Sequence, residues 1–278
     1  MFLFVLIFTG FFYIIGRYFE SSLSYLVLGL IISVASSITS YYYSDKIVLF
    51  TTGAKPAQKE DYFDFYTTTE NLAMAAGLPM PKLYVLEDPS LNAFATGRDP
   101  NHAVVCATTG LLRNLDRSEI EAVISHELSH IKNYDILLSS LIAVLVGTLA
   151  LVSDWVFRSF WWRDRNDDDG GRSPVAFFMF IIVLLITPIV ATLIQLSISR
   201  KRELLADASG SLITRNPAAL ISALKKISLY PGIKTASTST AHLFIANPFL
   251  DKRLSNWLSN LFSTHPPIDE RIRLLRSM

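Results

Sequence analysis

The sequence predicts an α-helical membrane protein that carries an α+β domain outside the bilayer. Two observations support this fold class. Hydrophobic residues make up 51% of the 278 residues and charged residues only 18%, whereas a soluble domain has about 25% charged residues. The apolar residues also gather in four runs without charged side chains, and the stretches between them combine short strand-like segments with amphipathic helices.

The four apolar runs cover residues 1–16, 21–44, 136–153 and 173–199. A membrane helix needs roughly 20 such residues, with about 17 as the lower end, so the first run is the weakest. That run lacks the positive n-region and the cleavage site of a signal peptide, and we expect it to be retained. We therefore predict two N-terminal membrane helices in residues 1–44 and a membrane hairpin in residues 136–199, with a short loop at 154–172.

Four crossings place residues 45–135 and 200–278 on the same side of the membrane, as the two halves of one domain. Lys and Arg near the membrane ends number seven on that side and five on the other. The seven are Lys46, Lys55, Lys59, Lys132, Arg200, Lys201 and Arg202, and the five are Arg17, Arg158, Arg163, Arg165 and Arg172. This bias predicts a multi-pass protein of the cell (inner) membrane whose larger domain is cytoplasmic.

Several classes of partner are not expected. The net charge of +1 gives no strong overall field, which argues against nucleic acid. The chain has no Gly-rich phosphate loop of the P-loop type, so we expect no ATP binding. Its single cysteine, Cys106, cannot form an intramolecular disulfide and is expected in the core.

The first half of the domain predicts a small sheet with helices. Strand-like runs rich in Val and Leu lie at residues 46–50, 82–86 and 102–107, and the last ends at a turn-prone segment, residues 108–110. A helix is predicted over residues 61–76, and Ser118 with Glu121 matches a capping box at the start of another. In the second half we expect a helix at 216–229, loops or a hairpin at 231–248 and a short helix at 269–275.

Residues 126–130 read HELSH, an HExxH motif on the helix that follows the capping box. At 3.6 residues per turn His126 and His130 lie on one face, where both imidazoles can bind one Zn²⁺, and Glu127 lies beside the open coordination position. This composition gives such a motif about 0.003 times by chance. The alternative is a pair of surface histidines on an amphipathic helix.

A zinc site needs a third protein ligand. The metzincin scheme fails, because the position six residues after His130 is Ile136. Charged residues flank the motif on both sides, so it lies outside the bilayer, unlike the motif of membrane-embedded zinc proteases. The remaining scheme takes a Glu from a second helix: Glu203 can bind zinc, and Asp207, one turn later, can hydrogen-bond a ligand histidine. The alternative is a solvated helix face with an Arg202–Asp207 pair.

These residues predict a gluzincin-like zinc metallopeptidase domain at the membrane surface. His130 lies six residues before the third apolar run and Glu203 four residues after the fourth, within roughly 10 Å of the membrane edge at 1.5 Å per residue. Membrane proteins or their exposed loops are therefore the expected substrates.

The order of the motifs resembles the HtpX family of membrane zinc endopeptidases. The segments that carry the resemblance are NAFATG at 92–97, HELSHIKNYD at 126–135, RELLAD at 202–207 and THPPIDERI at 264–272, together with the four apolar runs. The family is related to the CAAX prenyl proteases and is described as degrading misfolded membrane proteins under stress. The resemblance covers nearly the whole chain.

The resemblance implies one Zn²⁺ per chain, held by His126, His130 and Glu203, with Glu127 as the catalytic base. It also implies that an edge strand at residues 92–97 holds substrate backbone beside the zinc, through residues such as Asn92, Ala93 and Phe94. His265 matches a family position proposed near the reacting carbonyl. His102 and His242 match no family position and are expected to be structural.

Other function classes remain open at this point. A prenyl-protein processing protease would share the zinc site, but the four apolar runs offer no obvious chamber for a lipid tail. A non-catalytic zinc-binding scaffold needs no Glu at the second position of HExxH. A small transporter is disfavoured because no charged residue lies within the four runs.

Overall fold

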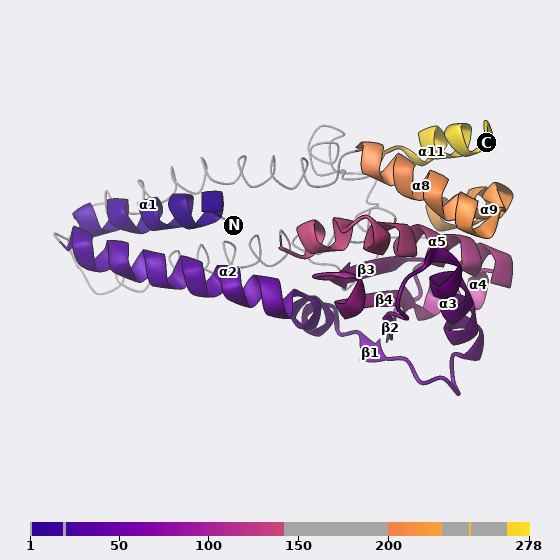
Figure 1. Ribbon diagram of the computed structural model, residues 1–278, viewed down its shortest axis with the longest axis horizontal. Coiled ribbons are helices and arrows are strands. Elements are labelled where there is room, and N and C mark those ends of the chain that lie inside the picture. Colours follow the sequence, from indigo (N-terminus) through magenta and orange to yellow (C-terminus); the bar gives the residue numbers. More distant parts are fainter. Residues whose placement is uncertain (1, 19–20, 142–199, 230–244, 246–265) are drawn as a thin grey trace, which may run out of the picture.

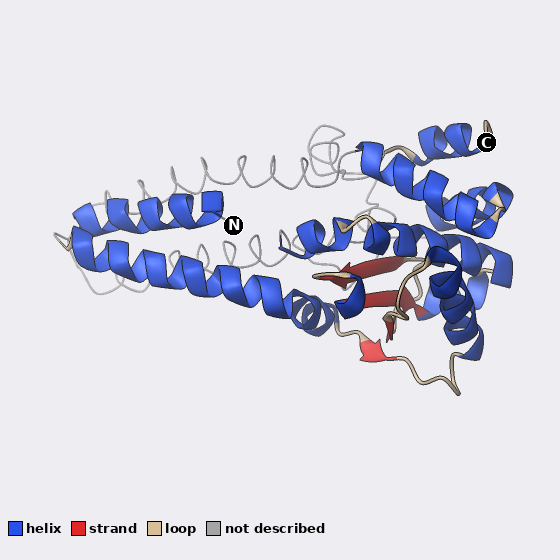
Figure 2. Ribbon diagram, in the orientation of Figure 1, coloured by secondary structure: helices blue, strands red, loops and turns tan. Residues whose placement is uncertain are grey.

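The computed structural model describes residues 2–18, 21–141, 200–229, 245 and 266–278. Two N-terminal helices extend away from a mixed domain, and the domain is built around a small sheet (Figures 1 and 2). The described residues are mostly helical with one small sheet, as the sequence predicts. Of the predicted hairpin at 136–199 only residues 136–141 are described, and they are helical; of the segment 231–248 only Ile245 is described.

The N-terminal helices are α1 (Phe2–Tyr18) and α2 (Ser22–Thr52), which lie side by side (Figure 1). Small residues let the two backbones approach, because a Cβ added to Gly29 of α2 would lie 2.5 Å from the Cβ of Phe12. The hydroxyls of Thr9 and Ser33 meet at 3.3 Å across the contact. Within the described part of the chain, α2 alone is long and apolar enough to cross a membrane.

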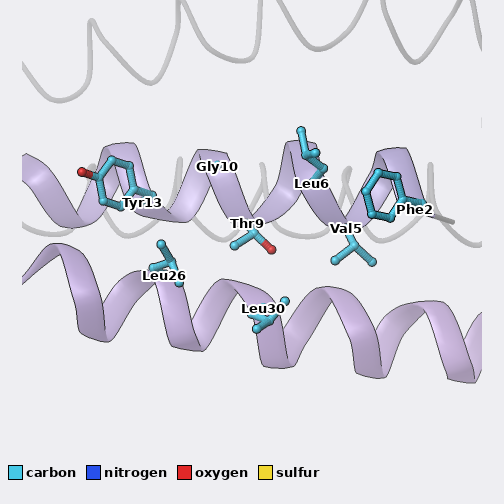
Figure 3. A pocket seen from close by; sticks show the side chains of 8 residues that line it. All are labelled: Phe2, Val5, Leu6, Thr9, Gly10, Tyr13, Leu26 and Leu30. Atoms are coloured by element: carbon cyan, nitrogen blue, oxygen red, sulfur yellow. The ribbon is translucent and has the colours of Figure 1, made fainter.

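An apolar groove of about 410 Å³ runs along the outer part of this helix pair. Figure 3 shows the side chains around it, which come from both helices: Phe2, Val5, Leu6, Thr9, Gly10, Tyr13, Leu26 and Leu30. Its lining is almost entirely hydrocarbon, as expected for helices that face lipid or other apolar helices.

The strand predicted at residues 46–50 is wrong, because these residues form the last turns of α2. Burial recurs there at Ser44, Val48, Leu49 and Thr52 while Phe50 is 89% exposed, which is the period of a helix. A short apolar run is ambiguous between strand and helix, and the packing of Val48 under the sheet decides it. Gly53 then ends the helix in the left-handed conformation, with φ of 74°.

The sheet has four strands in the order β1 (Lys55–Pro56), β2 (Lys82–Leu86), β4 (Ala103–Thr108) and β3 (Ala93–Gly97). β2 and β4 are parallel, and β1 and β3 pair antiparallel on the outside. The strands predicted at 82–86 and 102–107 are thus confirmed within one residue. β3 is an edge strand, and Cys106 of β4 is fully buried, as expected.

Helices cover both faces of this sheet. One face packs on the end of α2 through a small cluster of Val48, Leu86, Phe94 and Cys106. The other carries the main core, formed with the helices α3 (Phe63–Ala76), α4 (Thr109–Asn114), α5 (Arg117–Lys132) and α9 (Pro217–Leu229). α8 (Arg200–Thr214) and α11 (Ile268–Leu275) lie beyond α5, away from the sheet (Figure 1).

Two helix starts differ from the prediction. The turn expected at residues 108–110 is the start of α4, where the Thr108 hydroxyl accepts from the amide of Leu111 at 3.2 Å. The capping box of α5 is formed by Asp116 and Glu119 rather than by Ser118 and Glu121. Ser118 instead donates to Asp116 at 2.7 Å, because Asp116 already holds the cap position two residues earlier.

Glu119 also joins α5 to α9. Its buried carboxylate accepts from the hydroxyl of Ser222 and from the ammonium of Lys226, each at 2.7 Å, and from the amide of Asp116 at 2.9 Å. One side chain therefore caps the helix that carries the HExxH motif and fixes it to a neighbour.

We expect Glu119→Ala to lower the free energy of unfolding by about 2 kcal/mol, from roughly 1 for the cap and roughly 1 for the buried hydrogen bonds. Unfolding of the purified protein in detergent measures it. The matched control is Glu121→Ala on the same helix, whose partly exposed pair with Arg117 at 3.3 Å should contribute under about 0.5 kcal/mol. Equal losses for the two variants would contradict this role for Glu119.

Candidate metal centre

The two histidines of HExxH lie one turn apart on α5, and their rings meet edge to face. Nε2 of His126 and Nε2 of His130 are 3.2 Å apart, and the ring planes are inclined at 87°. His126 is buried and His130 is only slightly exposed. The geometry predicted from the helical period is thus present.

Helix α8 brings a carboxylate to the same point. Oε1 of Glu203 lies 3.3 Å from Nε2 of His130, and Oε2 lies 3.7 Å from Nε2 of His126. α8 can approach this closely because position 210 is glycine. A Cβ there would lie 2.9 Å from the backbone nitrogen of His126 and 3.1 Å from its Cα, so any larger residue would push the two helices apart.

The three side chains converge closely enough to hold one metal ion. Ligands at 2.0–2.2 Å from zinc are about 3.3 to 3.6 Å apart in a regular tetrahedron. The two Nε2 atoms are 3.2 Å apart, and Glu203 approaches His130 with Oε1 at 3.3 Å and His126 with Oε2 at 3.7 Å. Each histidine has its Nδ1 against a carboxylate, which favours a proton on Nδ1 and leaves Nε2 as the nitrogen that can bind a metal. Two such nitrogens and a carboxylate that meet in this way suit a cation.

Nδ1 of His126 faces Asp207, one turn after Glu203 on α8, with 2.9 Å between Nδ1 and Oδ1. Arg271 of α11 holds the far side of this carboxylate with two hydrogen bonds, 2.8 Å from Nε and 2.6 Å from an NH2 nitrogen. The guanidinium is fully buried and also lies 3.9 Å from Glu203. His126, Asp207 and Arg271 form the first His–Asp–Arg triplet.

His130 belongs to a second triplet with Asp135 and Arg202. Oδ2 of Asp135 lies 3.1 Å from Nδ1 of His130, and Oδ1 accepts from Arg202 at 2.7 Å. This triplet is more open to solvent than the first, because the Arg202 side chain is 41% exposed. The alternative Arg202–Asp207 pair considered for the sequence is therefore replaced by two separate pairs.

Sequence reasoning missed Arg271, Asp135 and Arg202 as parts of the centre. Asp207 is predicted because it lies one turn after Glu203. Asp135 could have been found from its place at the end of the HELSHIKNYD segment. Arg271 is 68 residues from Glu203 along the chain, and no local pattern connects them. Two signals point to it: Arg271 belongs to the THPPIDERI segment that carries the family resemblance, and it lies on the buried face of the terminal helix with Ile272 and Leu275.

Glu127, the second residue of the motif, is buried on α5. Burial raises the pKa of its carboxyl to about 7, and the negative charge of Glu203 acts in the same direction. The backbone amide of Ala95 in β3 is near this carboxylate and opposes the shift. A carboxyl with a pKa near neutrality can accept and release a proton at physiological pH.

The other predicted site residues lie at different places. Asn92 directly precedes β3, and Ala93 faces the core on the side of α5. Phe94 points the other way, into the cluster with Val48 and Cys106, because successive strand side chains alternate between faces. His102 is partly exposed and faces Asp99 with Nδ1 at 2.8 Å, whereas His242 and His265 lie outside the described residues.

Comparisons with known proteins identify the family of the chain. The model of peptidase family M48 matches residues 64–278. A protease HtpX homolog of Caldanaerobacter subterraneus subsp. tengcongensis is 42% identical, over 100% of this chain and 94% of that protein. One of Tropheryma whipplei is also 42% identical, over 100% of this chain and 93% of its own.

A solved structure shares the fold. The crystal structure of S. mikatae Ste24p matches with a TM-score of 0.53 and 17% identity, over 99% of this chain. This chain spans 61% of the length of that protein.

We expect metal binding to release a proton. Burial alone would lower the pKa of His130, but the carboxylates of Glu203 and Asp135 raise it to about 10 in the metal-free protein. The imidazole therefore holds a proton that a metal must displace. At about pH 8.5, above the pKa of Glu127 and below that of His130, zinc should displace one proton from His130, in addition to the proton that zinc-bound water loses above about pH 7.

Titration calorimetry of chelator-treated protein, in buffers of different ionisation enthalpy, counts these protons. The number of protons released should fall by about one above about pH 10, where His130 is already neutral. A proton release that does not fall between about pH 8.5 and about pH 11 would contradict the assignment of His130 as a ligand.

Proposed function

We propose a zinc site for a chain that belongs to peptidase family M48 and is a membrane zinc metalloprotease. In this proposal His126, His130 and Glu203 hold one zinc ion, and Glu127 is the catalytic base. The observation that carries this proposal is the convergence of the three ligand atoms, which all lie within 4.8 Å of one another. The domain is then of the gluzincin type, because its third ligand is a Glu on a second helix.

The reaction is hydrolysis of a peptide bond. Zinc in this position supplies a Lewis acid that polarises the scissile carbonyl and lowers the pKa of bound water from 15.7 to about 7. Glu127, with its own pKa raised to about 7 by burial, takes the proton of the attacking water and passes it to the leaving amine. Asp207 and Asp135 hold the two histidines in the orientation that ligation needs.

The substrates that we propose are misfolded or unfolded membrane proteins, as part of protein quality control under stress. Support comes from the position of the centre next to apolar segments: α5 is followed by the helix that starts at residue 135 and leads into the apolar run 136–153. A centre so close to a membrane helix meets loops and ends of membrane proteins first. We expect no requirement for nucleic acid or ATP.

The proposed topology follows from the same chain organisation. Residues 1–44 and 136–199 cross the membrane as two pairs of helices. Residues 45–135 and 200–278 meet on the cytoplasmic side, each contributing ligands to one centre. The contact of α5 with α8 supports this arrangement, because it requires both halves on the same side.

Glu127→Gln tests the mechanism. Gln has nearly the same shape but cannot accept a proton, and general acid–base groups contribute about 10²- to 10⁴-fold in rate. We expect the purified variant to retain one zinc and to lose cleavage of unfolded casein by at least about 100-fold. Metal analysis and a protease assay in detergent measure the two properties.

Glu203→Ala provides the comparison, because it should lose the metal as well as the activity. Retention of substantial protease activity in Glu127→Gln would remove the proposed mechanism. Loss of zinc from Glu127→Gln would mean that Glu127 is itself a ligand. Cleavage restricted to prenylated peptides would favour the prenyl-protein processing alternative.

Cysteine labelling of intact cells tests the topology. The natural Cys106 is buried and should not react, so single cysteines can be placed in this background. We expect a cysteine at Asp168 to react with a membrane-impermeant reagent and one at Lys59 to react only after lysis. Equal labelling of the two positions would contradict the proposed sidedness.

A further inference from the structure

The outer edge of β3 faces the candidate base. β3 pairs on one side with β4, where the amide of Thr108 donates to the carbonyl of Asn92 at 3.0 Å. In an antiparallel pair the bonded residues alternate. The backbone N–H and C=O groups of Ala93, Ala95 and Gly97 therefore point away from the sheet, and the amide of Ala95 meets Glu127 there.

An unpaired edge of this kind is where an extended peptide can add as a further strand. On the proposed function, the substrate backbone adds to β3 so that its scissile bond lies beside Glu127. How far that pairing extends depends on which edge groups are already occupied by the protein itself.

Both ends of the edge are occupied. The carbonyl of Ala93 accepts from the amide of Ile245 at 3.1 Å. At the other end the amide of Gly97 donates to Oγ of Ser140 at 3.2 Å. Between them, no described residue donates to the carbonyl of Ala95, and we take this carbonyl as the acceptor for a substrate amide.

Ser140 is firmly placed. Its Oγ also lies 2.8 Å from Oγ1 of Thr96, and both hydroxyls are fully buried. It sits on the helical segment 135–141, which begins at Asp135 of the second triplet. Ser40 of α2 donates to the carbonyl of the next residue, Leu141, at 3.5 Å. The hydroxyl at the end of β3 is thus positioned by the metal centre on one side and by a membrane helix on the other.

We propose that Ser140 is a specificity-determining residue that closes the Gly97 end of the substrate-binding edge. This inference rests on the proposed function. By occupying the amide of Gly97, Ser140 confines backbone pairing to the short stretch around Ala95, so that recognition requires only a few extended residues next to the scissile bond. A longer unfolded substrate therefore makes no additional backbone hydrogen bonds at the Gly97 end.

Two fluorogenic peptides with the same cleavage core test this, one of about four residues and one extended to about ten so that it can reach Gly97. Ser140→Ala leaves the amide of Gly97 without its partner, and a carbonyl of the long peptide can replace it. We expect KM for the long peptide to fall about fivefold, the value of one hydrogen bond. The readout is the ratio of the two KM values, in which any effect shared by both peptides cancels.

Three further variants complete the design. Ser140→Thr keeps the hydroxyl and should restore the wild-type ratio of the two KM values. Ser140→Cys nearly keeps the size of the side chain but has a weaker acceptor, so it should change the ratio of the two KM values in the same direction as Ser140→Ala. It provides the test if the alanine variant does not fold. Ser37→Ala is the matched control, because Ser37 is also a buried serine, lies on α2, and makes no hydrogen bond with a described residue through its Oγ.

An unchanged ratio of the two KM values in active Ser140→Ala and Ser140→Cys would overturn the inference alone. A loss of kcat that is equal for both peptides and is shared by Ser37→Ala would also overturn it, since it would show a structural role only. A zinc-loaded wild-type enzyme that cleaves neither peptide would overturn the proposed function, and the inference with it.

Discussion

Three potential ligand atoms from α5 and α8 lie within 4.8 Å of one another, where one metal ion could bind all of them. This convergence governs the packing of the second half of the domain. α8 must approach α5 closely enough that only glycine fits at position 210. α9 must fix the start of α5 through Glu119, and α11 must deliver Arg271 to the carboxylate that orients His126.

The buried charged side chains are gathered around the same candidate metal centre. The carboxylates of Glu127, Glu203 and Asp207 are buried, and Arg271 is the one fully buried guanidinium among the described residues. Buried charge is costly unless it is compensated, so a metal ion bound by the proposed ligands would also stabilise these buried carboxylates.

Local sequence patterns predict the residues of the centre that lie close together on the same helix, either α5 or α8. His126, Glu127 and His130 follow from the helical period, and Glu203 with Asp207 follows from the need for a third ligand and a one-turn spacing. The triplet partners Arg271, Asp135 and Arg202 depend on how helices pack, which no spacing encodes. The strand predicted at residues 46–50 is wrong for a related reason. A five-residue apolar run is compatible with a strand or a helix, and the packing of this segment against the sheet decides in favour of the helix. The capping box begins two residues earlier than predicted, because Asp116 rather than Ser118 occupies the N-cap position of α5.

The order of the groups along the chain has a consequence for biosynthesis. The two histidines are made first, Glu203 follows only after the apolar segments between residues 136 and 199, and Arg271 comes 68 residues later still. On the proposed ligand set, a nascent chain that ends before residue 203 contains HExxH without its third ligand and without the guanidinium that pairs with Asp207. We therefore expect proteolytic activity to appear only after the last segment of the domain has been synthesised and has folded onto the first.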